Sequence, residues 1–149
     1  MEVKVKKLNE NAVIPSYAKR GDAGLDLTAI SYSYDEKTDC HIYGTGLAFE
    51  IPYGHVGLIF PRSSNRKTEA YLTNSVGVCD SGYRGEIMIS FKNRDRGEDG
   101  EIKQMLAPYA VGDRVAQLII IPYPYITLIE SNILSNTDRG EGGHGYTGR

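Results

Sequence analysis

Hydrophobic and polar residues alternate along several short segments of the chain, with turn residues between them. Alternation with a period of two is typical of β-strands, in which successive side chains point to opposite faces. The segments between them contain residues that favour turns, such as the proline and glycine of Ile51-Pro-Tyr-Gly54. The pattern predicts an all-β domain, a sandwich or barrel of short strands. The clearest alternation runs over residues 47–51, 56–60, 87–91 and 115–121.

Two segments depart from this pattern. A serine of the pair Ser63-Ser64 can cap the run NRKTEAYL that follows it, which predicts one short helix of two or three turns at most. The longest apolar run, LIIIPYPYITLI, is interrupted by Pro122 and Pro124 and is shorter than the ~20 residues that cross a bilayer. We therefore expect a buried strand and an edge there, and no membrane contact.

Length, charge and cysteine content narrow the class of protein. The chain has 149 residues, enough for one domain with an ordinary core. Its net charge is −2 and no basic run forms a broad face, so nucleic acid is not expected as the main partner, whereas a small anionic ligand fits. Cys40 and Cys79 match no zinc or redox spacing, and the opening MEVKVKKLNE does not resemble a signal peptide. We expect a cytoplasmic protein with free thiols.

Two glycine-containing segments carry candidate chemistry. Val78-Cys-Asp-Ser-Gly-Tyr-Arg-Gly-Glu86 brings an acid and an aromatic ring together at a turn between two strands, with a plain surface hairpin as the alternative. Gly143-His-Gly-Tyr-Thr-Gly148 fits the phosphate-binding pattern G-x-G-x-x-G. A dinucleotide-binding fold needs a helix after these glycines, but only Arg149 follows. Backbone amides that contact phosphate remain possible, against the alternative of a frayed terminus.

Signals for a metal site or a serine nucleophile are weak. His41, His55 and His144 are scattered, without acidic or cysteine ligands beside them in sequence, so a tight protein-bound metal is not expected. No G-x-S-x-G motif occurs in the chain. The segment between Asn93 and Gly112 is charged and punctuated by glycine in its first half, which predicts a solvated loop.

Five short motifs follow one another along almost the whole chain. They are Ala23-Gly-Leu-Asp-Leu27, Pro61-Arg-Ser-Ser64, Gly77-Val-Cys-Asp-Ser-Gly-Tyr-Arg-Gly-Glu86, Gly112-Asp-Arg-Val-Ala-Gln117 and Arg139-Gly-Glu-Gly-Gly-His-Gly145. In this order they resemble the motifs of the trimeric dUTP diphosphatase (dUTPase) family. The resemblance implies a single distorted β-barrel or jelly-roll domain over residues 1–138, assembled as a homotrimer. It also implies a flexible C-terminal arm over residues 139–149 that closes the active site.

The resemblance further implies an activity and a division of roles. The family hydrolyses dUTP to dUMP and pyrophosphate by water attack at the α-phosphorus, with Mg²⁺ on the triphosphate, which keeps uracil out of DNA and supplies dUMP for thymidylate synthesis. Asp80 matches the general base that activates the water. Tyr83 matches the ring that packs under the deoxyribose and excludes a 2′-hydroxyl. The other positions matched to nucleoside binding are Asn74, Gly77, Val78, Met88 and His144.

The remaining matched positions concern the triphosphate. Asp26 matches an acid that reaches Mg²⁺ through ordered water, although an ion pair with Arg62 that joins two strands is an alternative or an additional role. Arg139 matches the arm residue that grips the γ-phosphate, with two parallel bonds available to its guanidinium. The full set matched to phosphate binding is Arg62, Ser63, Ser64, Gln117, Arg139, Gly143, Gly145 and Thr147.

The arm departs from the family pattern at two positions. His144 replaces a phenylalanine that stacks on uracil, and Tyr146 replaces a serine. Because imidazole is smaller and titrates near neutral pH, closure is expected to be weaker or pH-dependent. Two alternatives stay open: a dCTP deaminase, which would need a glutamate acting on the cytosine ring, and a signalling protein that uses dUTP occupancy as a switch.

Overall fold

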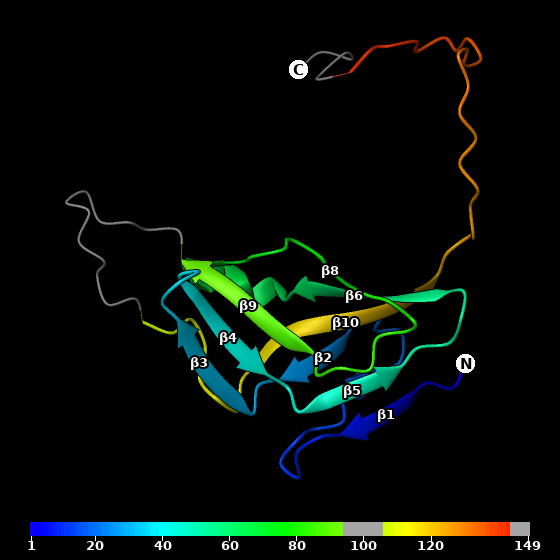
Figure 1. Cartoon of the computed structure of the whole chain (residues 1–149). Coiled ribbons are helices and arrows are strands. Elements are labelled where there is room, and N and C mark those ends of the chain that lie inside the picture. Colours follow the sequence, from blue (N-terminus) through cyan, green and yellow to red (C-terminus); the bar gives the residue numbers. More distant parts are fainter. Residues whose placement is uncertain (94–105, 144–149) are drawn as a thin grey trace, which may run out of the picture.

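The computed structural model describes residues 1–93 and 106–143, and these residues form ten strands and one short helix. All strand pairs are antiparallel. Two four-stranded sheets, ordered β2-β10-β6-β8 and β3-β4-β9-β7, enclose the core, and the two-stranded sheet β1-β5 lies beside them (Figure 1). This architecture confirms the all-β prediction.

The elements have the following bounds along the chain. They are β1 (Lys4–Lys7), β2 (Leu25–Thr28), β3 (Ser31–Asp35), β4 (Cys40–Gly44), β5 (Leu47–Glu50), β6 (His55–Pro61), the helix η1 (Ser63–Lys67), β7 (Ala70–Leu72), β8 (Gly77–Cys79), β9 (Met88–Asn93) and β10 (Arg114–Pro122).

Hydrophobic side chains from all three sheets meet in one core. Leu27 of β2 and Leu118 of β10 lie in the same buried cluster as Tyr43, Ile89 and Phe91 of the other large sheet. The ring of Tyr43 meets that of Phe91 edge-on, with 6.1 Å between their centroids. Edge-to-face pairs add to the free energy gained from burial alone. The core therefore joins the two sheets that carry the candidate site.

The period-two signal located four of the strands, β5, β6, β9 and β10, but it did not indicate which face of β6 is buried. The buried residues of β6 are Gly57 and Ile59, whereas the alternating residues Val56, Leu58 and Phe60 are only partly buried. Both faces of this strand carry apolar side chains, so alternation of residue type could not assign the inner face. In β10 a register shift between Arg114 and Ala116 interrupts the alternation, and the adjacent residues Val115 and Ala116 are both buried.

The predicted helix is shorter and tighter than the sequence indicated. It is a 3₁₀ helix of five residues, and no side-chain hydrogen bond caps its N-terminus. The expected serine cap is therefore wrong, because Arg62 occupies the capping position and the two serines lie inside the turn. Thr68, in extended conformation, ends the helix, and the chain enters β7. The result is a compact turn that presents Ser63 and Ser64 at the end of β6.

The segment that contains Asp80 is not a surface hairpin. The strand before it, β8, pairs with β6, and the strand after it, β9, pairs with β4 and β7 of the opposite sheet. The chain therefore crosses from one sheet to the other between Cys79 and Met88. This crossing places the turn over the edge of the core, where strands of both sheets contribute to one pocket.

The apolar run LIIIPYPYITLI forms the predicted buried strand only in its first part: residues 118–122 belong to β10 and Leu118 is buried, whereas the residues after Pro122 form no strand. β10 ends at Pro122, and the chain then extends away from the barrel toward the C-terminus (Figure 1). Tyr123 still donates its amide to Gly54, but Pro124 has no amide hydrogen for further pairing. Tyr125, Leu128 and Ile129 are more than 80% exposed. Within the described part of the chain, therefore, no element covers this segment.

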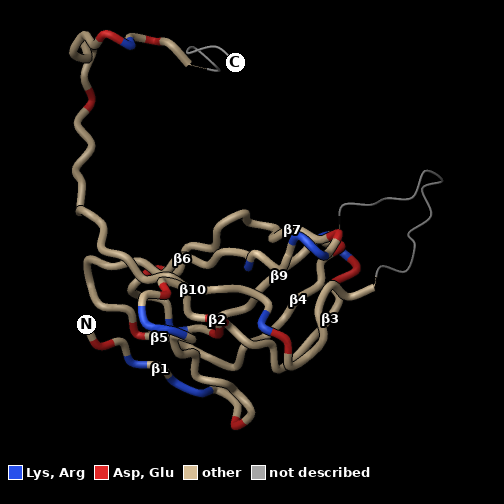
Figure 2. The backbone as a smooth tube through the Cα atoms, turned by 180° about the vertical axis from the view of Figure 1, so that it is seen from behind, with Lys and Arg blue, Asp and Glu red and all other residues tan. Residues whose placement is uncertain are grey.

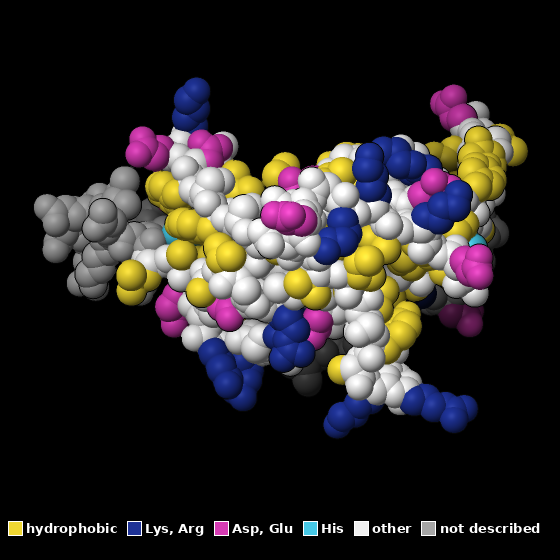
Figure 3. All heavy atoms as spheres, turned by 90° about the horizontal axis from the view of Figure 1, so that it is seen from below, with side chains coloured by type: hydrophobic (Ala, Val, Ile, Leu, Met, Phe, Trp, Pro, Cys, Tyr) yellow, Lys and Arg dark blue, Asp and Glu magenta, His cyan; other side chains and the backbone are white. Residues whose placement is uncertain are grey.

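Charged residues of both signs are interspersed along the backbone (Figure 2). On the face seen in Figure 3, lysine and arginine side chains lie among acidic and hydrophobic ones. Among the residues described, no helix is long and apolar enough to span a membrane. Cys40 and Cys79 are both buried and free, as the sequence predicted.

His41 lies fully buried between the strands of the second large sheet. Its Nδ1 atom is 3.0 Å from the hydroxyl of Tyr32, and its Nε2 atom is 3.3 Å from the side-chain amide of Asn93. Burial lowers the pKa of His41, and the negative charge of Asp39 opposes this shift only in part. The folded protein therefore holds a neutral imidazole at this position.

We expect acid to destabilise the fold through His41. Its pKa is lower in the folded chain than the ~6.5 of an unfolded chain, so below that pH the unfolded chain binds a proton that the folded chain does not. Stability is then lost as the pH falls below about 6.5. In His41→Gln the drop in Tm between pH 7.5 and 5.5 should be smaller than in the wild type, with His55→Gln as the matched control. Equal drops in all three proteins would contradict this account.

Candidate functional site

A pocket of about 240 Å³ opens where the crossing segment passes over the two sheets. Gly77 and Cys79 of β8 form its floor with Ile59 of β6, and Val78 and Met88, 66% and 59% exposed, are among its hydrophobic lining residues. The structure brings together all the residues between positions 74 and 88 that the sequence assigned to the base, the sugar and catalysis. These are Asn74, Gly77, Val78, Asp80, Tyr83 and Met88.

Short-range hydrogen bonds hold the turn around Asp80. The amide of Tyr83 donates to the carbonyl of Asp80 at 3.0 Å, and the guanidinium of Arg84 donates to the carbonyls of Ser81 and Tyr83. The hydroxyl of Tyr83 donates to the carbonyl of Glu86 at 3.0 Å, which fixes the tilt of the ring. Backbone and ring are thus held in place while the carboxylate of Asp80 stays exposed at the tip.

Glu86 attaches the far end of this turn to the connection between β4 and β5. Its Oε1 atom accepts a hydrogen bond of 2.7 Å from the amide of Gly46. Gly46 has a φ of +65°, a conformation that favours glycine, and this orients its amide toward the carboxylate. Glu86 also lines the pocket, but this bond directs its carboxylate to the backbone. It therefore serves as a structural acceptor.

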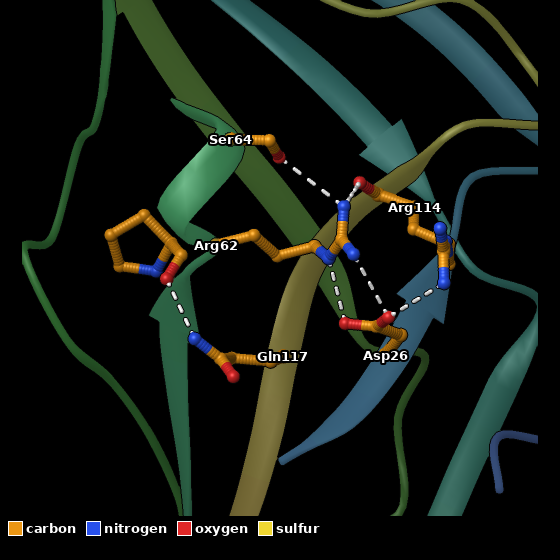
Figure 4. A network of polar contacts seen from close by, with 6 residues as sticks. Asp26, Arg62, Ser64, Arg114 and Gln117 are labelled. Atoms are coloured by element: carbon orange, nitrogen blue, oxygen red, sulfur yellow. Dashed lines mark hydrogen bonds and ion pairs between the residues drawn. The ribbon is translucent and has the colours of Figure 1, made fainter. Parts of the chain in front are cut away.

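A second polar group forms where β2, β6 and β10 meet, and Figure 4 shows its bonds. The guanidinium of Arg62 donates through Nε and Nη2 to the two oxygens of Asp26, at 2.7 and 3.0 Å. Arg62 also donates through Nη1 to the hydroxyl of Ser64 at 3.2 Å, which connects the ion pair to the helix η1. Asp26 accepts a further bond of 3.2 Å from Arg114.

Gln117 occupies the same group from the middle of β10. Its amide donates to the carbonyl of Pro61 at 3.0 Å, which directs the side chain toward the end of β6. A Cβ atom at position 24 would collide with Gln117 Oε1, so any larger residue there would have to displace the end of the Gln117 side chain. Arg62, Ser64 and Gln117 thus form one polar surface beside Ser63.

The structure supports the strand-joining role of Asp26 and limits its metal role. Both carboxylate oxygens accept bonds from arginine, so direct coordination of Mg²⁺ would compete with two cations. No group of three or more potential ligands is close enough to hold a metal within residues 1–93 and 106–143. Mg²⁺ commonly keeps several waters and binds to substrate phosphates, and the partly exposed carboxylate of Asp26 fits contact through such a water.

The two groups are separate in a single chain. None of Arg62, Ser63, Ser64 and Gln117 is among the residues that line the pocket. Arg139 and Gly143 lie in the extension that runs away from the barrel, where Arg139 donates to the carbonyl of Gly142. His144, Gly145, Tyr146 and Thr147 lie outside the described residues. The structure therefore brings together two separate groups: the predicted nucleoside residues between positions 74 and 88, and the group of Arg62, Ser64 and Gln117.

Comparison with known proteins decides the family. A family model described as dUTPase matches residues 10–148. The chain belongs to the dUTPase family. Among curated relatives of this family, the deoxyuridine 5'-triphosphate nucleotidohydrolase of Nautilia profundicola is 40% identical over 150 residues, and the match covers 100% of both chains.

Solved dUTPase structures have the same fold. The dUTPase of Staphylococcus bacteriophage 80alpha, with dUPNHPP, matches with a TM-score of 0.81 and 29% identity, covering 99% of each chain, and is described as controlling transfer of virulence genes by a G protein-like mechanism. A mutant dUTPase from phage phi11 of S. aureus matches with a TM-score of 0.71 and 28% identity, covering 89% of this chain and 98% of that one, and coordinates a structural Mg(II) ion.

The sequence did not assign roles to two side chains of the candidate site. Arg114 is the second guanidinium on Asp26, and Glu86 is the acceptor that holds the crossing segment. Both lie within motifs that the sequence singled out, Gly112–Gln117 and Gly77–Glu86. Their partners, however, are 88 and 40 residues away in sequence, so only the folded pairing of strands shows what they bind.

Proposed function

We propose that the protein hydrolyses dUTP to dUMP and pyrophosphate, with Asp80 as the general base. The observation that carries this proposal is the pocket of about 240 Å³, which Asp80, Tyr83 and Asn74 line together with the residues of β8. Family membership supports the substrate. Because Mg²⁺ accompanies the triphosphate, we treat the magnesium complex of dUTP as the substrate.

Asp80 is suited to activate a water molecule. Its carboxylate is exposed at the tip of a turn that other residues hold, so it can accept a proton without losing a structural contact among the described residues. A positioned general base contributes typically 10²–10⁴ to the rate. Attack by this water at the α-phosphorus gives dUMP and pyrophosphate, and the proton passes to Asp80.

Selection of deoxyuridine follows from fixed polar groups and a rigid ring. Backbone groups of β8 and the amide of Asn74 can pair with the uracil edge, and a site that pairs with N3–H and O4 leaves polar groups unsatisfied against cytosine. The ring of Tyr83, tied to the Glu86 carbonyl, provides a wall under the sugar that leaves no room for a 2′-hydroxyl. Dense packing makes such a wall selective.

The triphosphate would be held by the second polar group, on the surface formed by Arg62, Ser63, Ser64 and Gln117. Guanidinium and hydroxyl donors suit the α- and β-phosphates. Asp26 neutralises part of the arginine charge and can accept from a water on Mg²⁺. Arg139, Gly143, Gly145 and Thr147 of the arm would cover the γ-phosphate, and His144 would stack on uracil.

The assembly that unites these groups is a homotrimer in this proposal. Its support is that one chain keeps the nucleoside pocket, the phosphate surface and the arm apart, and that residues 123–134 expose an apolar extension. Packing this extension on a neighbouring copy would bury it and carry the arm to a site formed by other subunits. A cytoplasmic location, consistent with two free thiols, is part of the proposal.

One assay tests the activity. The purified protein is incubated with Mg²⁺ and, separately, dUTP, dCTP, dTTP and UTP, and pyrophosphate and base identity are measured. We expect pyrophosphate from dUTP and at least about 10⁴-fold lower kcat/KM for dCTP. Deamination of dCTP would support a deaminase, for which Glu86 is poorly placed because Gly46 occupies its carboxylate. Binding without hydrolysis would support a signalling protein that uses dUTP occupancy as a switch.

A further inference from the structure

Tyr109 connects the hydrophobic core to the helix η1. It lies between the end of the undescribed segment 94–105 and β10, and its ring packs against Phe91 and Tyr43, with centroids 5.2 and 6.0 Å away. Its backbone is bound twice to one side chain. The hydroxyl of Tyr43 donates to the Tyr109 carbonyl at 2.9 Å and accepts from the Tyr109 amide at 3.0 Å. Tyr43 is fully buried, so Tyr109 is fixed to the core.

The side chain of Tyr109 ends at Asn65, which lies next to the phosphate surface in sequence. Its hydroxyl donates to Oδ1 of Asn65 at 2.8 Å, a short bond between two partly buried groups. Asn65 is the third residue of η1 and follows Ser64 directly. Burial raises the pKa of Tyr109, while the positive charge of Arg62 opposes that shift, so the phenol remains protonated and donates at neutral pH.

Asn65 connects Tyr109 to the rest of this turn through three further hydrogen-bonding groups. Its side-chain amide donates to the carbonyl of Ala70 at 2.9 Å, its backbone amide donates to the Arg62 carbonyl, and its backbone carbonyl accepts from Thr68. With the Tyr109 bond, both ends of the Asn65 amide are satisfied inside the protein. The orientation of Arg62, Ser63 and Ser64 is thereby tied to the aromatic core of the other sheet.

We propose that Tyr109 is a positioning residue for triphosphate binding, which acts by holding Asn65 and with it the turn Arg62–Ser64 in the phosphate-binding orientation. The inference rests on the proposed function, because it takes this turn to be the phosphate surface. It does not place Tyr109 in contact with substrate. The nucleoside pocket receives no side chain from Tyr109 or Asn65, so nucleoside binding should be independent of the bond.

The test compares two ligands on Tyr109→Phe, which keeps the ring and removes only the hydroxyl. Dissociation constants are measured for dUpNHpp with Mg²⁺, which engages both surfaces, and for deoxyuridine, which engages the pocket alone. We expect affinity for dUpNHpp to fall about three- to tenfold, as for loss of one hydrogen bond, and KM for dUTP to rise similarly. Affinity for deoxyuridine should stay within about twofold. The control, Tyr32→Phe, removes a hydroxyl that contacts His41 in the same sheet and should change neither constant.

A double-mutant cycle tests whether Tyr109 acts through Asn65. Asn65→Ala should weaken dUpNHpp binding, and adding Tyr109→Phe to it should cause little further loss, because the same bond is already absent. Additive losses would overturn the proposal, as would unchanged dUpNHpp affinity in Tyr109→Phe or equal weakening of both ligands. A wild-type protein that neither binds dUpNHpp nor hydrolyses dUTP would instead overturn the proposed function itself.

Discussion

Asp80→Asn should fold, bind dUTP and lose at least about a thousandfold in turnover, because an amide cannot take the proton of the attacking water. The carboxylate of Asp80 makes no hydrogen bond to any residue in the described ranges, and the turn is held instead by Tyr83 and Arg84. Replacing one carboxylate oxygen with an amide therefore removes chemistry and leaves the pocket intact. The measurements are kcat at saturating Mg²⁺ and dUTP, and the dissociation constant of dUpNHpp.

The matched control is Glu36→Gln, which neutralises an exposed acid at the turn after β3. It should retain wild-type kcat, which separates the loss of a base from the loss of a charge. Near-normal turnover in Asp80→Asn would exclude the assignment of the base. Loss of dUpNHpp binding together with turnover would show that Asp80 mainly holds substrate.

Ending the chain at Asp138 should lower dUTP hydrolysis by orders of magnitude while leaving a folded protein that binds nucleotide weakly. The cut removes Arg139 and the glycine amides, so the grip on the γ-phosphate and the exclusion of water are lost together. The barrel and the exposed run 123–134 remain, so the assembly should persist, which sedimentation would check. Unchanged turnover would mean that the terminus is merely frayed.

Two comparisons sharpen this experiment. Full-length Arg139→Ala removes the guanidinium and keeps the backbone. Comparing its loss of dUTP hydrolysis with that of the truncated protein measures how much of the effect is due to the arginine side chain. Mixing the truncated protein with full-length Asp80→Asn tests whether arms cross between chains, since a mixed trimer can combine an intact Asp80 with an arm from another subunit. Activity above that of both parents is expected, and none after demonstrated subunit exchange would refute crossing.

The sequence predicted most of the fold where local chemistry decides structure. Period-two segments located strands such as β9 and β10, and one motif, Gly77–Glu86, contributed most of the pocket lining. The sequence did not predict the features that depend on pairing between residues far apart in the chain. β8 and β9 flank a turn as a hairpin would, yet they pair in different sheets. The inner face of β6 could not be read, because apolar residues occupy both faces.

The same limit applies to the site. One of the serines Ser63 and Ser64 was expected to cap a helix, and both were expected to hold phosphate. Because Arg62 takes the capping position, neither serine caps the helix, and only the proposed phosphate role remains. Asp26 and Arg62 were read as a possible pair, and the geometry adds Arg114 as a third member. The run LIIIPYPYITLI was predicted to be buried because its composition is apolar. Its first part lies in β10, whereas no residue of the described chain covers the rest.

The ion cluster of Asp26, Arg62 and Arg114 has a consequence for how fast substrate arrives. Two guanidinium groups share one carboxylate, which leaves one positive charge in excess at the phosphate surface of a chain whose net charge is −2. The overall field repels a polyanion weakly, while the local field attracts it. Under the proposed function, this contrast would direct the triphosphate end of the nucleotide toward this surface. Since salt screens such fields over about 10 Å at 0.1 M, encounter at low ionic strength is faster and better oriented than encounter at high ionic strength.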